Sequence, residues 1–184
     1  VAVFSLMHEL GHAIAARQTG ATAQISLDFL AGYASFAPTR PLKRWERAGI
    51  SMAGPFVQIA LGCIVLLALG VNPIDHDQFA ADYWSFAIWW AGPAIGLFNL
   101  IPVLPLDGGT IVAEIIDFFT PGRGREIMVK LSPPLTAAGF IAMVMVDDLR
   151  PLAAFAAILL VLQLQTLSAN AANSPDHRTA LIER

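Results

Sequence analysis

Long apolar stretches without a charged side chain dominate the pattern along this chain. Asp, Glu, Lys, Arg and His are all absent from residues 48–71, 83–106, 131–146 and 151–175. Each stretch supplies most or all of the about 20 apolar residues that a helix needs to cross a bilayer. The pattern therefore predicts four membrane-spanning segments.

A further segment at the start of the chain, residues 1–19, is apolar except for four ionisable side chains: His8, Glu9, His12 and Arg17. At 1.5 Å per residue this segment reaches roughly 28 Å, about the thickness of a bilayer core. Its opening lacks the charged head of a signal peptide, so we expect that the upstream part of a longer helix is missing or that the start site is misassigned. The predicted fold class is an all-α polytopic membrane protein with about five transmembrane segments, forming one domain over residues 1–184.

Basic residues are distributed unevenly between the two sides that five crossings would create. Of the 11 Lys and Arg residues, all but Arg150 would lie on the same side. Cytoplasmic loops carry an excess of Lys and Arg, so this side is interpreted as cytoplasmic. The C-terminus is then also predicted to be cytoplasmic.

The composition agrees with a membrane protein and excludes an ordinary soluble domain. Apolar residues make up 56% of the chain and charged residues only 14%, against about 25% charged residues in soluble proteins. Membrane lipid is therefore an expected partner. The formal net charge of −3 gives no electrostatic footprint for a nucleic acid, so no nucleic-acid partner is expected.

Ionisable side chains inside an apolar segment are costly, so the sequence His8-Glu9-Leu10-Gly11-His12 is the most informative part of the chain. Residues at positions i and i+4 share one face of a helix, so both imidazoles can bind one Zn²⁺. Glu9 can then act as general base on a water at the metal. The alternative is a pair of histidines at a helix interface, each bonded to a neighbouring side chain.

Two histidines and a water leave one protein ligand to be found. Candidates at or near membrane depth are Asp28, Asp107, Glu114 and Asp117. Asp107 is best placed because it ends a long uncharged segment and precedes two glycines. A helix over residues 107–119 would descend about 18 Å toward the basic inner loop, and residues 8–17 would descend about 14 Å, which puts both motifs at one level. A simple N-cap role for Asp107 is the alternative, and it does not exclude metal binding.

The third apolar segment is expected to be a broken helix. A continuous helix over residues 83–119 would be about 55 Å long, nearly twice the bilayer core. Pro102 and Pro105 lack amide donors, so the irregular stretch should fall between residues 99 and 107. Non-helical backbone at this depth needs shelter from protein or a water-filled cavity, and we expect these residues to line a wet cavity. Residues 25–38 alternate partially and contain Gly32, which suggests a short β-hairpin.

The His8-Glu9-Leu10-Gly11-His12 motif occurs here with Asn99, Pro102 and Asp107 in the pattern Asn-x-x-Pro-x-x-x-x-Asp-Gly. Together the two motifs resemble the site-2 protease family of intramembrane zinc metalloproteases. The resemblance implies a catalytic core over residues 1–120, with additional transmembrane helices at 131–146 and 151–170. It also implies a multi-pass protein of a bacterial cell membrane that hydrolyses peptide bonds in or near transmembrane segments of its substrates.

The same resemblance assigns roles to individual residues. It implies that His8, His12 and Asp107 bind one Zn²⁺, that Glu9 is the catalytic base, and that Asn99 lies near the scissile peptide. It further implies that residues 25–37 form a membrane-dipping β-hairpin that can pair with an unwound transmembrane substrate.

The chain departs from the family pattern in its second segment and lacks the family's larger accessory domains. Ala53-Gly54-Pro55 resembles the family's glycine-proline element, but Gln58 stands where an Asn is common. Neither a PDZ module nor a nucleotide-sensing domain fits in the polar stretches, so a short, core-only member is expected.

Two other classes of function remain open. A metal transporter would need ligands along a path, which the uncharged segments do not provide. The other alternative is a non-proteolytic zinc-binding membrane partner or a clipped inactive core. An in-frame extension of the first helix in the upstream genomic sequence would argue against the clipped core.

Overall fold

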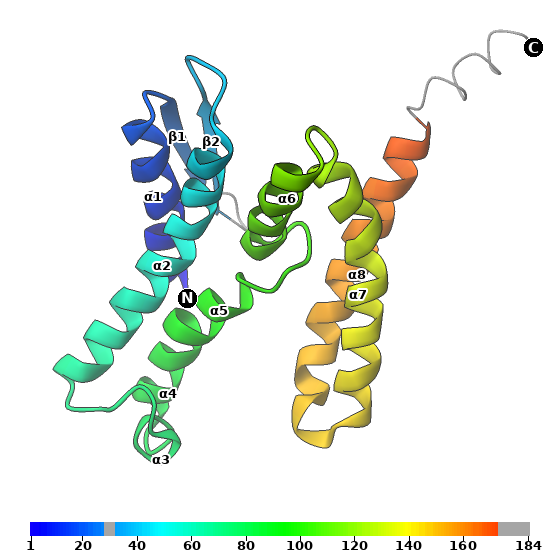
Figure 1. The fold of residues 1–184 in the computed structure, drawn as a ribbon. Helices are drawn as coiled ribbons and strands as arrows, with labels where there is room; N and C mark the ends of the chain where they lie inside the picture. Colours follow the sequence, from blue (N-terminus) through cyan, green and yellow to red (C-terminus); the bar gives the residue numbers. More distant parts are fainter. Residues whose placement is uncertain (28–31, 173–184) are drawn as a thin grey trace, which may run out of the picture.

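The computed structural model describes residues 1–27 and 32–172, and in these ranges it is mostly helical with one small antiparallel sheet (Figure 1). The elements are α1 (Ala2–Gln18), β1 (Thr22–Leu27), β2 (Gly32–Ala37), α2 (Arg44–Ala68), α3 (His76–Phe79), α4 (Tyr83–Trp89), the π-helical turn η1 (Trp90–Ala94), α5 (Ile95–Phe98), α6 (Asp107–Phe119), α7 (Gly124–Met145), the 3₁₀ turn η2 (Asp147–Leu149) and α8 (Arg150–Ala172). The predicted helical fold is thereby confirmed at this level.

Three of these helices are long and apolar enough to cross a membrane: α2, α7 and the part of α8 from Leu152–Ala169. They correspond to the second, fourth and fifth predicted segments. The first segment forms α1, which has 17 residues, and the third is divided among several shorter helices. Ile64, Ile141 and Ile158 illustrate the large apolar side chains that these three helices expose on their outer surfaces.

Helices α1 and α2 pack side by side at very short range (Figure 1). A Cβ atom on Gly11 of α1 would lie only 2.6 Å from the Ala53 carbonyl oxygen of α2, closer than real Cβ atoms come. Only glycine therefore allows this approach, as is typical of helix pairs in membranes, whose backbones come close through small residues. The close packing brings the polar groups of α2 to the histidine-bearing face of α1.

The predicted hairpin is present as a two-stranded antiparallel sheet beside α1 (Figure 1). Its register pairs Thr22 with Ala37 and Leu27 with Gly32. The first strand begins at Thr22, three residues before the predicted start at Ile25, because its pairing with the second strand extends to Thr22 and Ala37. Asp28, one of the candidate metal ligands, lies outside the described residues.

The third segment is broken where the sequence predicts it. Helix α5 ends at Phe98, α6 begins at Asp107, and the eight residues between them contain only turns and bends. The predicted helix over residues 107–119 matches α6. Asp107 is its first residue, and the N-cap is Leu106, so Asp107 itself is not the N-cap.

Helices α7 and α8 form an antiparallel pair that supports the irregular stretch from the other side (Figure 1). The Leu104 amide donates to Ser132 Oγ of α7 at 2.8 Å, and Gln163 of α8 donates through Nε2 to the Leu104 carbonyl oxygen and to Thr136 Oγ1. Two side chains thus supply the hydrogen bonds that a helix would otherwise provide at this depth.

The side chains of the irregular stretch do not all face water, contrary to the sequence-based expectation. Val103 and Leu106 are buried in an apolar cluster with Leu159 of α8. The expectation that these positions line a wet cavity is therefore wrong for Val103 and Leu106. In a non-helical stretch the direction of each side chain follows local turns, which periodicity does not predict.

Candidate metal centre

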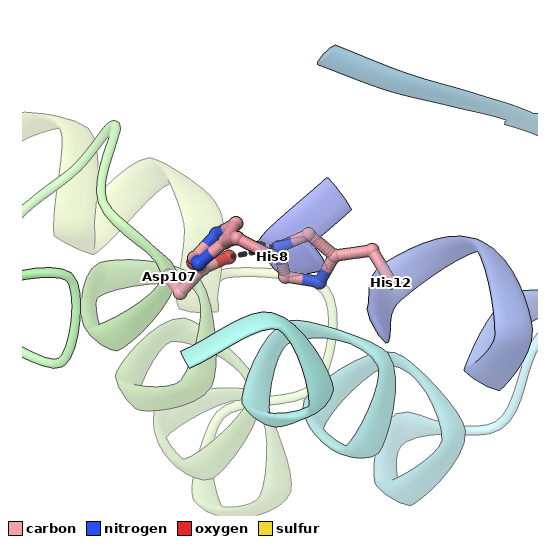
Figure 2. A group of neighbouring side chains, drawn as sticks. All are labelled: His8, His12 and Asp107. Carbon is pink, nitrogen blue, oxygen red and sulfur yellow. Dashed lines mark hydrogen bonds and ion pairs between the residues drawn. The ribbon is translucent and has the colours of Figure 1, made fainter. Parts of the chain in front are cut away.

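Three predicted ligands converge between α1 and α6 (Figure 2). His8 and His12 lie one turn apart on α1, and Asp107 begins α6. One ligand atom from each residue lies within 4.8 Å of the other two. The structure therefore brings together the two histidines and the carboxylate that the sequence singled out.

The separations between the ligand atoms are close to those of a tetrahedral zinc site, although two of the three are slightly shorter. The two Nε2 atoms are 3.0 Å apart, His8 Nε2 lies 3.1 Å from Asp107 Oδ2, and His12 Nε2 lies 3.4 Å from Asp107 Oδ1. Zn–N and Zn–O bonds of about 2.0–2.2 Å at tetrahedral angles place neighbouring ligand atoms roughly 3.3–3.6 Å apart. Three protein ligands also match the composition of catalytic zinc sites, in which the fourth position is open to water or substrate.

The hydrogen-bond partners of the two Nδ1 atoms also support a metal site between the histidines and Asp107. His12 Nδ1 lies 2.7 Å from the Ile50 carbonyl oxygen, which can only accept a hydrogen bond. In a neutral imidazole the proton is then on Nδ1, and the lone pair of Nε2 points toward His8 and Asp107. His8 Nδ1 has its own carbonyl partner at 2.8 Å, the side-chain oxygen of Gln58. Metal-binding histidines are typically held in this way by a partner on the second ring nitrogen.

Glycine at position 54 makes room for one of the two rings. A Cβ atom at Gly54 would lie 2.5 Å from His12 Cε1 and in collision with His12 Nε2. The part of the His12 ring around Nε2, the atom that faces Asp107, is therefore packed against bare backbone of α2. This contact gives Gly54 a tight-packing role between α2 and the His12 ring.

Glu9 and Asn99, the other two predicted site residues, are neighbours of the cluster along the backbone. Glu9 follows His8 on α1 and is half-buried. Asn99 caps the C-terminus of α5, and its carbonyl oxygen accepts a hydrogen bond of 2.8 Å from the Gly108 amide. This bond fixes the backbone of Asn99 next to the start of α6, one residue from Asp107.

The alternative acidic ligands on α6 are used elsewhere. Glu114 forms a two-pronged ion pair with Arg47, with N–O distances of 2.6 and 2.7 Å. Asp117 accepts from Arg44 Nε at 3.0 Å. Both partners lie at the start of α2, so these carboxylates connect α6 to α2 and do not join the histidines. The structure therefore agrees with the preference for Asp107 over Glu114 and Asp117 as the third ligand.

A cavity of about 570 Å³ extends from the histidine–aspartate cluster toward the turn between α6 and α7. Its lining is rich in polar side chains, including His12, Ser51, Asp107, Thr110, Glu114 and Arg125. The turn contains Gly122, whose φ of +80° favours glycine. The cavity leads to the candidate metal centre past these polar side chains and past the apolar groups that make up most of its surface.

The sequence reasoning missed the contribution of the second apolar segment to this site. Ile50 acts through its backbone, which leaves no signal in the sequence. Gln58 could have been found, because it is the one Gln, Asn or His within residues 48–71 and lies one helical turn after Gly54.

The fold and the site define a class: a helical protein with membrane-length segments and a buried candidate metal centre of two histidines and one aspartate. The family model of Peptidase family M50 matches residues 71–146. A solved site-2 protease from Methanocaldococcus jannaschii superposes with a TM-score of 0.54 and 25% identity, covering 88% of this chain and 69% of that one.

Three curated relatives are also similar in sequence. A putative zinc metalloprotease of Synechocystis is 28% identical over 125 residues, or 66% of this chain and 31% of the relative. A zinc metalloprotease of Methanocaldococcus jannaschii is 30% identical, with 60% and 31% covered. The putative zinc metalloprotease Rip3 of Mycobacterium tuberculosis is 32% identical, with 58% and 27% covered.

The chain spans about a third of the length of these curated relatives. Within that span, the resemblance to the site-2 protease family is confirmed by the family model, the relatives and the solved structure.

Proposed function

We propose that this protein is an intramembrane zinc metalloendopeptidase that hydrolyses peptide bonds in or near the transmembrane segments of membrane proteins. The observation that carries the proposal is the convergence of His8, His12 and Asp107, of which His12 and Asp107 also line a cavity. The names of the relatives, zinc metalloproteases and a site-2 protease, support the same activity.

In the proposed mechanism, His8, His12 and Asp107 hold one Zn²⁺. When bound, the ion supplies Lewis-acid activation of water and of the scissile carbonyl. Glu9 accepts the proton from the attacking water and later transfers it to the leaving amine. Asn99 donates through its side-chain amide to the substrate near the scissile bond.

The substrate has to be unwound before cleavage, because the peptide groups of a transmembrane helix are satisfied within the helix. We propose that the β1–β2 hairpin is membrane-associated and that one of its free edges adds the unwound substrate as a further strand. The hairpin packs beside α1, the helix that carries His8 and His12, which supports this role.

The finer topology follows from the distribution of charge. We propose five crossings in a bacterial cell membrane, by α1, α2, the broken third segment, α7 and α8, with a cytoplasmic C-terminus. Residues 1–120 form the catalytic core, and residues 131–146 and 151–170 the additional transmembrane helices of this one domain. Reporters fused after Arg47 and after Arg125 should read cytoplasmic, and one fused at Asp77 should not. If the reporter fused at Asp77 were cytoplasmic, the five-crossing topology would be wrong.

The mechanism separates metal binding from proton transfer, and this separation provides its test. Substituting Ala for His8, His12 or Asp107 should lower zinc content below one ion per chain, measured by elemental analysis of purified protein. Glu9→Gln should keep the zinc and lower cleavage of a transmembrane reporter substrate by about 10²–10⁴-fold, because a base and no ligand is lost.

Two outcomes would contradict the proposal. Full turnover in Glu9→Gln would exclude Glu9 as the base. Zinc binding by the wild-type protein without cleavage of any membrane substrate would instead favour a non-proteolytic zinc-binding membrane partner.

A further inference from the structure

Gln58 makes two hydrogen bonds that connect separate parts of the fold to the candidate metal centre. It is only 2% exposed on α2. Its Nε2 donates to the Ala91 carbonyl oxygen at 2.7 Å, and its Oε1 lies 2.8 Å from His8 Nδ1. One side chain therefore joins the π-helical turn η1 to a predicted metal ligand on α1.

The Ala91 contact determines which end of the amide faces His8. A backbone carbonyl oxygen can only accept, so the amide nitrogen of Gln58 must point at Ala91. The amide oxygen is then the end that faces His8, and it too can only accept. His8 Nδ1 must therefore carry a proton, which in a neutral imidazole leaves the Nε2 lone pair toward Asp107 and His12.

The anchor at Ala91 is itself fixed by the irregular hydrogen bonding of η1. In an α-helix the Ile95 amide would donate to Ala91, but here it donates to the carbonyl oxygens of Gly92 and Trp90. The Ala91 carbonyl thus remains available to Gln58. Such π-helical turns are frequent at functional sites, and this one presents a carbonyl to a buried side chain.

We infer that Gln58 is a positioning residue that fixes the tautomer and orientation of the His8 imidazole for metal binding. This inference rests on the proposed function, because it takes the zinc site as the reason for the buried bond. It gives a role to the position at which the chain departs from the family's common Asn: the longer side chain reaches from α2 to both η1 and α1.

The test compares two substitutions of Gln58 with opposite properties. Gln58→Leu is close in size but cannot accept the His8 proton. Gln58→Glu keeps an oxygen acceptor toward His8, but it places an ionisable group in a buried position, and when ionised it has no donor for the Ala91 carbonyl oxygen. If Gln58 only fills space, Gln58→Leu should keep more of the zinc affinity than Gln58→Glu. If Gln58 positions His8, Gln58→Glu should keep more.

The first readout is zinc affinity, measured by competition with a chromophoric chelator on the purified full chain. The positioning role predicts that Gln58→Leu loses about 10–100-fold in affinity, the range typical for second partners of metal-binding histidines, and that Gln58→Glu loses less. The matched control is Gln78→Leu, the same substitution on the exposed short helix α3, where among the described residues the side chain bonds only to Asp75 and Asn72. Its affinity should equal that of wild type.

The second readout is independent of bound metal and of activity. ¹⁵N chemical shifts of selectively labelled histidine in the metal-free protein should show the Nδ1–H form for His8 in wild type and Gln58→Glu, and a mixture of tautomers in Gln58→Leu. Equal zinc affinity and the same tautomer in wild type and Gln58→Leu would overturn the role of Gln58 and leave the protease proposal intact. Failure of the wild-type protein to bind zinc would overturn both.

Discussion

The two halves of the molecule bury polar side chains for different purposes. In the half formed by α1, α2 and α6, buried polar groups surround the two imidazoles: Gln58 and the Ile50 carbonyl hold their Nδ1 atoms. In the α7–α8 half, Ser132 and Gln163 hold the backbone of Leu104 in the irregular stretch before Asp107. The first half orients ligands, and the second stabilises the backbone on which the third ligand depends.

This difference predicts that substitutions in the two halves separate metal binding from stability. Changes against the imidazoles should lower zinc affinity and activity together. Changes in the α7–α8 half should lower the free energy of unfolding while the ligand set stays intact. The predictions below test this separation, in order of decreasing effect.

The largest effect is expected for Gly54→Ala. The new methyl group would lie 2.5 Å from His12 Cε1 and collide with Nε2, so the ring must move out of its position opposite Asp107. Loss of ligand geometry should lower zinc affinity at least about tenfold. Misplacement of this order should also lower peptidase activity by about 10²-fold. Chelator competition and a transmembrane reporter substrate measure the two effects.

Gly49→Ala is the matched control on the same helix. A Cβ atom there meets no other atom within 4 Å. This variant should bind zinc like wild type, and its thermal unfolding temperature should rise slightly, since Ala is favoured over Gly in a helix interior by up to about 1 kcal/mol. Equal zinc affinity in Gly54→Ala and Gly49→Ala would show that α2 does not constrain the His12 ring.

A smaller effect on function and a clear effect on stability are expected for Ser132→Ala. The substitution removes the acceptor of the Leu104 amide, and a buried amide without a partner costs about 1–3 kcal/mol. Chemical unfolding of the zinc-loaded protein in detergent should show this loss, while the zinc content stays near wild type.

Ser168→Ala in α8 provides the comparison, because Ser168 is exposed and, among the described residues, bonds only to the Gln165 carbonyl within its own helix. Its free energy of unfolding should stay within about 0.5 kcal/mol of wild type. If Ser132→Ala lost zinc as completely as a ligand variant, the proposed division between the two halves would be wrong.

The sequence predicted the parts of the site that depend on local spacing. His8 and His12 share a helical face at any depth in the fold, and two prolines were enough to place the break before Asp107. The partners of Glu114 and Asp117 were missed because Arg44 and Arg47 lie on another helix, some 70 positions away. Ion pairs between distant segments leave no pattern along one sequence.

Helix ends were also predicted less well than helix centres. The uncharged stretch at 131–146 marks the part of α7 suited to lipid, but α7 begins at Gly124. Its first turns are charged, and Lys130 pairs with Glu126 at 2.6 Å in the i, i+4 arrangement that favours a helix. The uncharged stretches therefore predicted which parts of the helices are suited to lipid, but they did not predict where the helices begin and end.

The last prediction, with the smallest expected effect, concerns which side of the broken segment is in contact with water. It is tested by comparing the rates at which introduced cysteines are chemically modified. Ser51 and Thr110 line the polar cavity, whereas Val103 and Leu159 are buried in the apolar cluster between the irregular stretch and α8. In a background with Cys63→Ala, Ser51→Cys and Thr110→Cys should react with a small water-soluble thiol reagent much faster than Val103→Cys and Leu159→Cys, because the thiolate that reacts needs water around it. Zinc binding by each variant serves as the check that the site is intact. A Val103→Cys protein that reacts as fast as Ser51→Cys would mean that water also reaches the α8 side of the break, and the assignment of one wet side and one dry side would then be wrong.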